Sequence, residues 1–364
     1  MSDENNIEIN DGLEGLGVLT GEKNIGLGTL TGKNITVNIN NSETKKLITQ
    51  KEIEIEVNIE EYLPTSIYHL LNAHDNPLVT FIIKAKDKTK HVKITSYIDG
   101  YSAKAINTIE VKANTEEKVY QLPTLFPHLI TNIREITRVT LHLKVEMIDS
   151  NIVKEDSYPI SLFSRNSAIF DYYNLRTGEH QFIPQYLGVF VTPNHPEIIN
   201  FLRTITNFHP KKVLVGYQEK EEAIPQQVRA VFDALKSIEL RYTNSIVDSN
   251  PNQKFHGHRV RLPRESLKEQ QAGTLDGVLL FASLLEACSL NSAIVLIPAH
   301  AFLAWERGDD NREWEFLETT MINSNSFDEA CEKGELIAKE FQEQDELTIL
   351  PIKELREKGI TPME

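Results

Sequence analysis

Three polar side chains with complementary chemistry follow one another along the second half of the chain. Thr274 begins a run, 275–287, that is apolar nearly all round and predicts a buried helix. His300 follows a run of β-branched residues, and Glu318 follows a short aromatic segment, so each should stand on or beside a strand. A hydroxyl, an imidazole and a carboxylate are the groups of a nucleophile, its base and the residue that orients the base. We therefore expect Thr274, His300 and Glu318 to meet as one constellation.

Each of these residues also has a structural interpretation. Thr is a favoured N-cap residue, and at the start of this helix Thr274 would contribute about 1 kcal/mol whether or not it reacts. His300 fits a hydrogen-bonded interior residue, and Glu318 fits its partner or the partner of an arginine. The residue types alone therefore predict a cluster more firmly than an activity.

The order helix, strand, strand resembles the transglutaminase-like branch of the papain-like cysteine peptidase fold. In that branch a nucleophile at the start of a buried helix precedes a His and an acid on the next strands. The resemblance extends to a bacterial group of such proteins that carries a β-sandwich in front, and it covers about residues 50–345. The segments that resemble that group's landmarks are 188–194, 260–267, 275–277, 279–286 and 317–320.

The chain departs from that family at the nucleophile. Catalytic members carry a Cys before the Leu-Asp pair, whereas here Thr274 precedes Leu275 and Asp276. A thiol beside a helix N-terminus and a His ionises near neutral pH, but a Thr hydroxyl is far less acidic. The resemblance thus implies a catalytically degenerate protein that binds a peptide or acts as a scaffold. The alternative is an active amide hydrolase or acyl transferase in which His300 and Glu318 activate Thr274.

Composition places the chain among ordinary soluble globular proteins. Its 364 residues suffice for two or three domains, with 40% hydrophobic and 25% charged residues. A formal net charge of −15 and the lack of a basic block argue against a nucleic-acid partner. No apolar run approaches the roughly 20 residues of a membrane span, and the first residues do not resemble a signal peptide. We expect a cytoplasmic protein without a membrane partner.

The sequence predicts neither a cofactor nor a metal. His256 and His258 lie two apart and would share one face of a strand, but no further ligand has metal-site spacing near them. Cys288 and Cys331 are the only cysteines, and they give no disulfide framework. Cys288 falls at the far end of the predicted helix from Thr274, and Cys331 lies in an acidic segment that would raise its pKa. Neither cysteine is expected to replace the nucleophile.

Three parts of the chain differ in composition and pattern. Residues 1–45 are a flexible segment rich in Gly, Asn and Thr, residues 46–165 predict an immunoglobulin-like β-sandwich, and residues 166–364 form the transglutaminase-like domain. Within the first part, two near-identical units at 16–40 resemble the amyloid signalling motifs of bacterial defence proteins. Such alternating units can stack with other chains, so a third interpretation is a defence-type adaptor that self-associates through 16–40.

The predicted fold class is α+β. Period-two alternation and turn-like breaks define the strands of the first half, and 3.6-residue periodicity defines the later helices. Residues 166–185 are polar and are expected to be a connection. The predicted strands are 53–59, 79–83, 92–98, 106–111, 139–147, 293–297 and an edge strand at 347–352; the predicted helices are 196–207, 224–237, 327–344 and 352–359.

Overall fold

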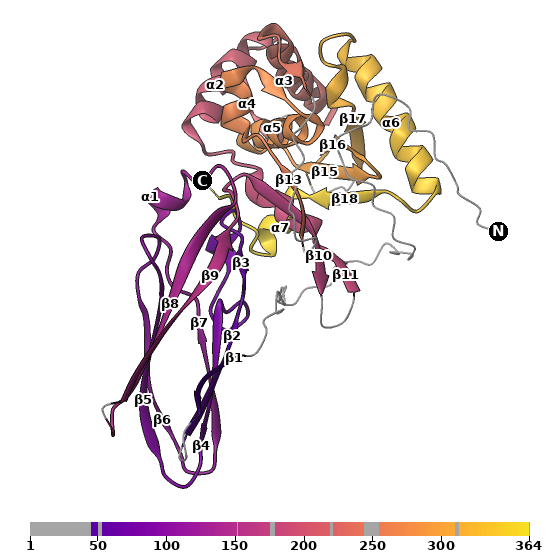
Figure 1. Cartoon of the computed structure of the whole chain (residues 1–364). Coiled ribbons are helices and arrows are strands. Elements are labelled where there is room, and N and C mark those ends of the chain that lie inside the picture. Colours follow the sequence, from indigo (N-terminus) through magenta and orange to yellow (C-terminus); the bar gives the residue numbers. More distant parts are fainter. Residues whose placement is uncertain are drawn as a thin grey trace, which may run out of the picture.

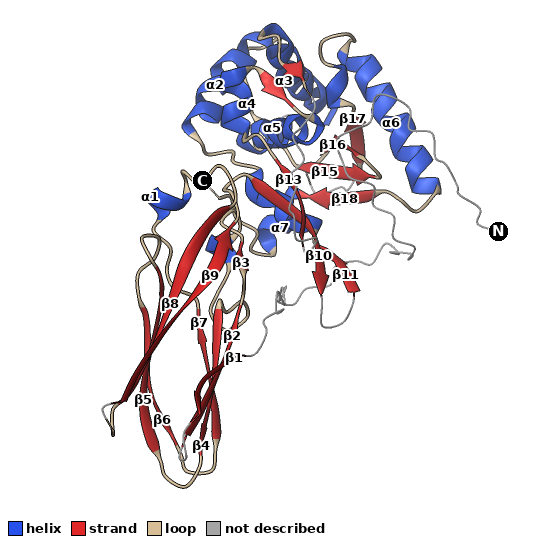
Figure 2. Cartoon of the chain, viewed as in Figure 1, coloured by secondary structure: helices blue, strands red, loops and turns tan. Residues whose placement is uncertain are grey.

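The computed structural model describes residues 45–49, 53–150, 152–174, 179–218, 221–243, 255–309 and 313–363. The described chain is an α+β protein, with antiparallel sheets in its first part and helices packed on sheets in its second (Figures 1 and 2). The repeat predicted at 16–40 lies outside the described residues. Within the described ranges, none of the helices combines the length and apolarity that a bilayer crossing needs.

Two sheets pack on one common core in the first part. The first has the strand order β1-β2-β4-β7 and the second the order β3-β9-β8-β5-β6. All neighbouring strands are antiparallel except the short parallel pair of β3 with β9. The elements are β1 (Lys45–Thr49), β2 (Ile53–Ile59), β3 (Tyr62–Leu63), η1 (Tyr68–Leu70), β4 (Val79–Ala85), β5 (Lys90–Ile98), β6 (Ala105–Val111), β7 (Glu116–Gln121), α1 (Pro127–Ile130), β8 (Thr137–Met147) and β9 (Ile152–Leu162).

The apolar residues that alternate along the predicted strands are the ones whose side chains are buried. In β2, Ile53, Ile55, Val57 and Ile59 are buried, and the residues between them are half-buried. Successive side chains of a strand point to opposite faces, so a period of two places one face on the core. The five strands predicted in this part are confirmed.

A four-stranded antiparallel sheet, β17-β16-β15-β18, organises the second part. Its strands are β15 (Ser292–Ile297), β16 (His300–Glu306), β17 (Trp314–Leu317) and β18 (Thr348–Pro351). One face, with Ala301, Leu303 and Trp305, packs in the same core as α5 (Thr274–Ala287). The other face, with Val295 and Phe302, packs against α6 (Phe327–Glu343). The sheet therefore lies between α5 and α6 (Figure 1).

Helix α5 is apolar all round because other elements surround it. Residues 275–285 are all buried, and α2, α3 and α4 contact the helix on the sides that the sheet leaves open. A helix in the middle of a core has no solvent-facing side to carry polar residues. These neighbours and the remaining elements are η2 (Pro184–Phe190), α2 (Pro196–Phe208), η3 (Gly216–Gln218), η4 (Glu221–Ala223), α3 (Ile224–Ser237), α4 (Pro263–Glu269), η5 (Thr319–Met321) and α7 (Ile352–Glu357). The predicted helices and the edge strand β18 are confirmed.

The prediction of a polar connection at 166–185 is wrong. This stretch forms β10 (Ser167–Asn174) and β11 (Glu179–Phe182), which join β13 (Phe255–Arg259) in a three-stranded sheet of order β11-β10-β13. Ala168, Ile169 and Phe170 are buried in the core of the second part. The partner strand β13 lies far along the chain, so local polarity gave no sign of the pairing.

The two parts are joined by packing and by hydrogen bonds. Tyr62, in β3 of the first part, is buried in the core of the second part. Its ring stacks on Phe163 with 5.7 Å between ring centroids. Arg165, 7% exposed, donates through Nη1 to the Thr65 carbonyl at 2.7 Å and through Nη2 to the Met363 carbonyl. One buried guanidinium thus connects the first part to the end of the chain.

Candidate functional site

The N-terminus of α5 is held by Asp276 and not by Thr274. Gly273 is the N-cap residue and Thr274 is the first residue of the helix, so the expectation that Thr274 caps it is wrong. The Asp276 carboxylate accepts from the Gly273 N–H at 2.7 Å and from the Arg261 N–H at 2.8 Å. Asp276 closes the helix start because it lies three residues after the cap, where a carboxylate reaches back to the cap N–H.

Thr274 is left with a side chain that has no structural task in the described part of the chain. The residue is partly exposed, and among the described residues its hydroxyl makes no hydrogen bond. Its place in the first turn of α5 exposes it to the free N–H groups and the positive end of the helix dipole. The position therefore suits a group that gains negative charge.

His300 and Glu318 form a direct pair. His300 begins β16 directly after the two-residue turn that joins it to β15, and Glu318 is the N-cap residue of η5. His300 Nε2 lies 2.6 Å from Glu318 Oε2, and the side chains are only 15% and 5% exposed. The second oxygen of Glu318 accepts from the N–H of Thr320 at 3.0 Å and from its hydroxyl at 2.6 Å.

Two opposed effects act on the pKa of Glu318. Burial alone raises it, but the hydrogen bond and charge of His300, together with the two Thr320 hydrogen bonds, outweigh burial and hold the pKa below its usual range. Glu318 is therefore a carboxylate at neutral pH and can only accept. It follows that His300 Nε2 carries the hydrogen and donates it, and that Nδ1 is the nitrogen left for another group.

The structure brings two of the three predicted residues together. His300 and Glu318 are hydrogen-bonded, and α5, which begins with Thr274, packs against both β16 and η5. His300 shares a face of β16 with Phe302, its ring stacked at 6.3 Å between centroids, and Phe302 packs on the side of α6. Within the described residues the Thr274 hydroxyl is not hydrogen-bonded to His300. The structure thus forms the pair of His300 and Glu318, and Thr274 is linked to it only through the packing of α5 on β16 and η5.

Tyr242 is a residue of this region that the sequence did not indicate. It lies in β12 (Arg241–Tyr242), which pairs in parallel with β14 (Gln271–Ala272) just before α5. A Cβ on Gly277 would lie 2.1 Å from the Tyr242 hydroxyl, so the phenol occupies the space above the first turn of α5. Burial raises the pKa of Tyr242, the Thr319 side chain lowers it less, and Glu318 and Asp276 raise it further. Gly277, in a helix where Gly is costly, was the one available signal.

The two cysteines do not supply a nucleophile. Cys288 is the C-cap residue at the far end of α5, and burial raises the pKa of its thiol to about 12. Burial, followed by the charge of Asp328, raises the pKa of Cys331 to about 12. Both thiols stay protonated at neutral pH, and the position of Cys288 and the raised pKa of Cys331 agree with the sequence.

The described side chains contain no group of three His, Cys, Asp or Glu residues arranged to hold a metal ion. His258 is 7% exposed, and its ring packs against Phe170 at 5.1 Å between centroids. The side chain of His256 lies outside the described part. A buried imidazole against an aromatic ring is a packing arrangement, and it gives His258 a structural role.

Comparison with models of known protein families gives no match, and comparison with curated proteins finds no relative. The functional interpretation therefore depends on the geometry of the residues themselves and on the resemblance stated from the sequence.

Proposed function

We propose that this chain is a transglutaminase-like protein of the papain-like fold whose catalytic domain has become a peptide-binding or scaffold module. The observation that carries the proposal is the hydrogen bond between His300 and Glu318, since Glu318 caps η5 and η5 packs against the helix that Thr274 begins. A base and its orienting acid remain, while a Thr stands where the resemblance places a Cys. In this proposal residues 1–45 are a flexible segment, 46–165 an immunoglobulin-like sandwich and 166–364 the transglutaminase-like domain.

Loss of catalysis follows from the acidity of the hydroxyl. The pKa of an alcohol lies far above that of a thiol, so the dipole of α5 and a neighbouring imidazole do not give a useful alkoxide population. Activation by a base needs a hydrogen bond between nucleophile and imidazole, and Thr274 and His300 lack one in the described structure. In this proposal a peptide binds at the polar groups of Thr274 and His300 without being cleaved, because the reactive thiol is missing.

The second candidate is an active amide hydrolase or acyl transferase, and the free hydroxyl of Thr274 favours it. Thr274 neither caps α5 nor bonds to another described group, so its side chain is available to a substrate carbonyl. In this mechanism Oγ1 attacks the carbonyl, the His300 nitrogen remote from Glu318 takes the hydroxyl proton, and that proton passes to the leaving amine. The acyl group then moves from Thr274 to water or to a second amine.

One experiment separates these candidates. Purified wild-type protein and Thr274→Ala are incubated with a diverse peptide pool, and cuts and crosslinks are read by mass spectrometry. Products that appear with wild type and vanish with Thr274→Ala would establish an active enzyme. No products from a folded wild-type protein support the binding module.

Thr274→Cys tests whether only the nucleophile is missing. The helix N-terminus and His300 should lower the pKa of the new thiol, so it should react with iodoacetamide at pH values where Cys288 and Cys331 do not. His300→Ala in the same background should move the reactivity to higher pH. A thiol with ordinary pH dependence in both proteins would refute an intact catalytic arrangement.

The repeat at 16–40 supports a compatible role as a defence-type adaptor that assembles through this segment. Sedimentation velocity of the full chain and of a variant lacking residues 1–45 tests it. Unchanged self-association after the deletion would refute this role.

A further inference from the structure

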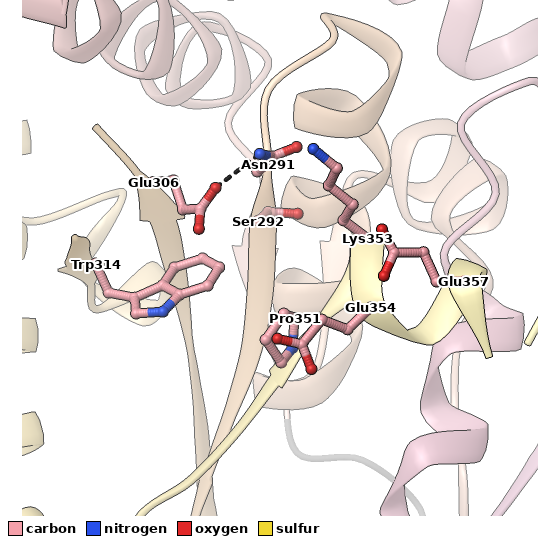
Figure 3. A pocket seen from close by; sticks show the side chains of 8 residues that line it. All are labelled: Asn291, Ser292, Glu306, Trp314, Pro351, Lys353, Glu354 and Glu357. Atoms are coloured by element: carbon pink, nitrogen blue, oxygen red, sulfur yellow. Dashed lines mark hydrogen bonds between the residues drawn. The ribbon is translucent and has the colours of Figure 1, made fainter. Parts of the chain in front are cut away.

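A polar cavity lies at the opposite end of the β15–β16 hairpin from His300. Its volume is about 210 Å³, and Figure 3 shows the side chains that line it. His300 begins β16 and Glu306 ends it, so six residues at about 3.3 Å each separate the two places by roughly 20 Å. The lining residues are Asn291, Ser292, Glu306, Trp314, Pro351, Lys353, Glu354 and Glu357.

The cavity forms where β18 stops. β18 ends at Pro351, opposite Ala293 of β15, and the chain turns there into α7. The first residue of β15, Ser292, therefore has no strand beside it on that side, and side chains of α7 border the space instead (Figure 3). The hollow is a consequence of sheet topology and does not need a flexible loop.

The charge of the lining is strongly negative. Three carboxylates, Glu306, Glu354 and Glu357, and one ammonium, Lys353, line the space. Outside the lining, Asp309 lies 3.3 Å from Lys353, and the Lys358 ammonium lies 3.6 Å from Glu354. Glu306 is only 5% exposed, and Asn291 Nδ2 donates to its Oε2 at 2.7 Å, which fixes the carboxylate. A cation entering this space is attracted, whereas an anion is repelled.

An aromatic ring adjoins the Glu306 carboxylate, and a buried hydroxyl lies on the other face of the sheet. Trp314 is the direct cross-strand partner of Glu306, so both side chains stand on one face, about 5 Å apart at Cβ. Ser292 is 2% exposed, and its hydroxyl has no hydrogen-bond partner in the described part of the chain. Figure 3 shows this hydroxyl turned toward the α7 side, into the space that the lining residues surround. A buried hydroxyl without a partner is a group that a ligand can satisfy.

We propose that this cavity binds the guanidinium group of an arginine side chain. A guanidinium is planar, donates two parallel hydrogen bonds to a carboxylate and stacks on an indole face. Glu306 and Trp314 offer these two surfaces side by side. A volume of about 210 Å³ is below the roughly 300–1,000 Å³ of sites for drug-sized ligands, so it suits one side chain.

Binding of two capped amino-acid amides and of free L-arginine to the full chain tests the proposal. N-acetyl-arginine amide carries the guanidinium, N-acetyl-citrulline amide is its neutral isostere, and free L-arginine adds the charges of a single amino acid. Titration calorimetry should give saturable binding of the arginine amide and none of the citrulline amide. Fluorescence should change with it, because the chain has two tryptophans, Trp314 at the cavity and the fully buried Trp305.

Matched variants locate the site. Glu306→Gln removes the charge but keeps a group that Asn291 can bond, and it should weaken binding about tenfold or more. Glu357→Gln, at an exposed lining residue, should weaken binding less and leave the fold intact, and Glu340→Gln, exposed on α6, should change nothing. Thr274→Ala should bind as wild type does, because the site is independent of the proposed function.

The relative affinities of the capped arginine amide and free L-arginine show which ligand the cavity prefers. Tighter binding of the capped amide than of free L-arginine assigns the site to arginine side chains of a polypeptide, and the reverse order assigns it to the free amino acid. Either result supports guanidinium recognition. Equal binding of the citrulline amide, unchanged affinity in both Glu306→Gln and Trp314→Leu, or no binding to folded wild-type protein would overturn the proposal.

Discussion

At the scale of single residues, Glu318 shows how burial and hydrogen bonding compete. Burial of the carboxylate favours its neutral form, yet three hydrogen bonds from His300 and Thr320 leave it ionised. Burying a carboxylate costs desolvation free energy, and the hydrogen bonds to Glu318 must offset that cost. The same bonds hold the His300 ring in a single orientation.

Glu318→Gln should reveal this balance through pH. The folded-state pKa of Glu318 is below the unfolded value, so its contribution to stability is complete above about pH 4.3 and is lost as pH falls through the folded pKa. We expect the substitution to cost about 1–3 kcal/mol at pH 7, and the difference from wild type to shrink between about pH 5 and 3.

Urea denaturation at a series of pH values measures the difference, with the exposed Glu340→Gln as control. A gap between Glu318→Gln and wild type that stays constant or widens toward pH 3 would contradict the assigned direction of the pKa shift.

At the scale of elements, close approaches of backbone and side chain set where the site residues lie. Tyr242 rests on Gly277 of α5, and Gly334 of α6 lies so near β17 that an added Cβ would be 2.8 Å from the Leu317 nitrogen. Glycine in a helix interior costs about 1 kcal/mol relative to Ala, so each marks a place where packing outweighs helix propensity. These contacts hold α5 close to β12 and α6 close to β17.

Gly277→Ala should destabilise the protein despite the better helix propensity of Ala. The new Cβ would lie 2.1 Å from the Tyr242 hydroxyl oxygen, so the ring or the helix must move, and we expect a loss of about 1–3 kcal/mol. Tyr242→Phe removes that oxygen, and the double variant should therefore be more stable than the sum of the single effects. Thermal unfolding of the four proteins gives the coupling, and strict additivity would argue against the contact.

The turn before His300 carries a residue in an unfavourable conformation. Ala299 has φ = 59° and follows Pro298, the pattern of a type II turn that usually places Gly at this position. Left-handed backbone costs a residue with a Cβ about 1–2 kcal/mol, so Ala299→Gly should stabilise the protein by about 1 kcal/mol after the entropy of the unfolded Gly is included.

Chemical denaturation checks this, with Ala103→Gly as control because Ala103 is exposed and has no positive φ. The control should lose a few tenths of a kcal/mol. Equal destabilisation by the two substitutions would show that the turn is not strained.

At the scale of the whole molecule, buried arginines tie distant segments together. Arg165 links the Thr65 loop to Met363, and Arg356 of α7 binds both carboxylate oxygens of Glu286 on α5 at 2.9 Å. Arg356 also donates to the Gly188 and Val191 carbonyls at 2.8 Å each. The end of the chain is thus linked through Arg356 to η2 and α5, and through Arg165 to the loop at Thr65.

Arg165→Met should weaken the coupling between the two parts. It keeps the apolar stem but leaves the Thr65 and Met363 carbonyls without their donor, which should cost about 2–3 kcal/mol. Differential scanning calorimetry should then show separate or broadened transitions where wild type unfolds more cooperatively. Lys144→Met, at a half-buried residue of β8 in the first part, is the control. An Arg165→Met profile that matches wild type would show that the guanidinium does not couple the parts.

Local pattern in the sequence determined most of the elements. The alternation of Ile53 to Ile59, the apolar run after Thr274 and the 3.6-residue period of 224–237 each predict the observed element, because burial of one face follows directly from periodicity. The pairing of His300 with Glu318 was also foreseen, from residue type and from the resemblance. These features depend on near neighbours in the chain.

Tertiary structure alone decided the features that depend on distant partners. Strands β10 and β11 exist because β13 pairs with β10, and Tyr242 reaches α5 because β12 pairs with β14 about thirty residues later. The N-cap residue of α5 is Gly273, whose N–H donates to Asp276, and not the predicted Thr274. Backbone geometry, and not side-chain preference, sets the first helical residue here. The cavity at Glu306 arises where β18 ends, and no local pattern encodes the absence of a neighbour. Pairing and packing over long sequence separation therefore decided what surrounds the residues that the sequence had named.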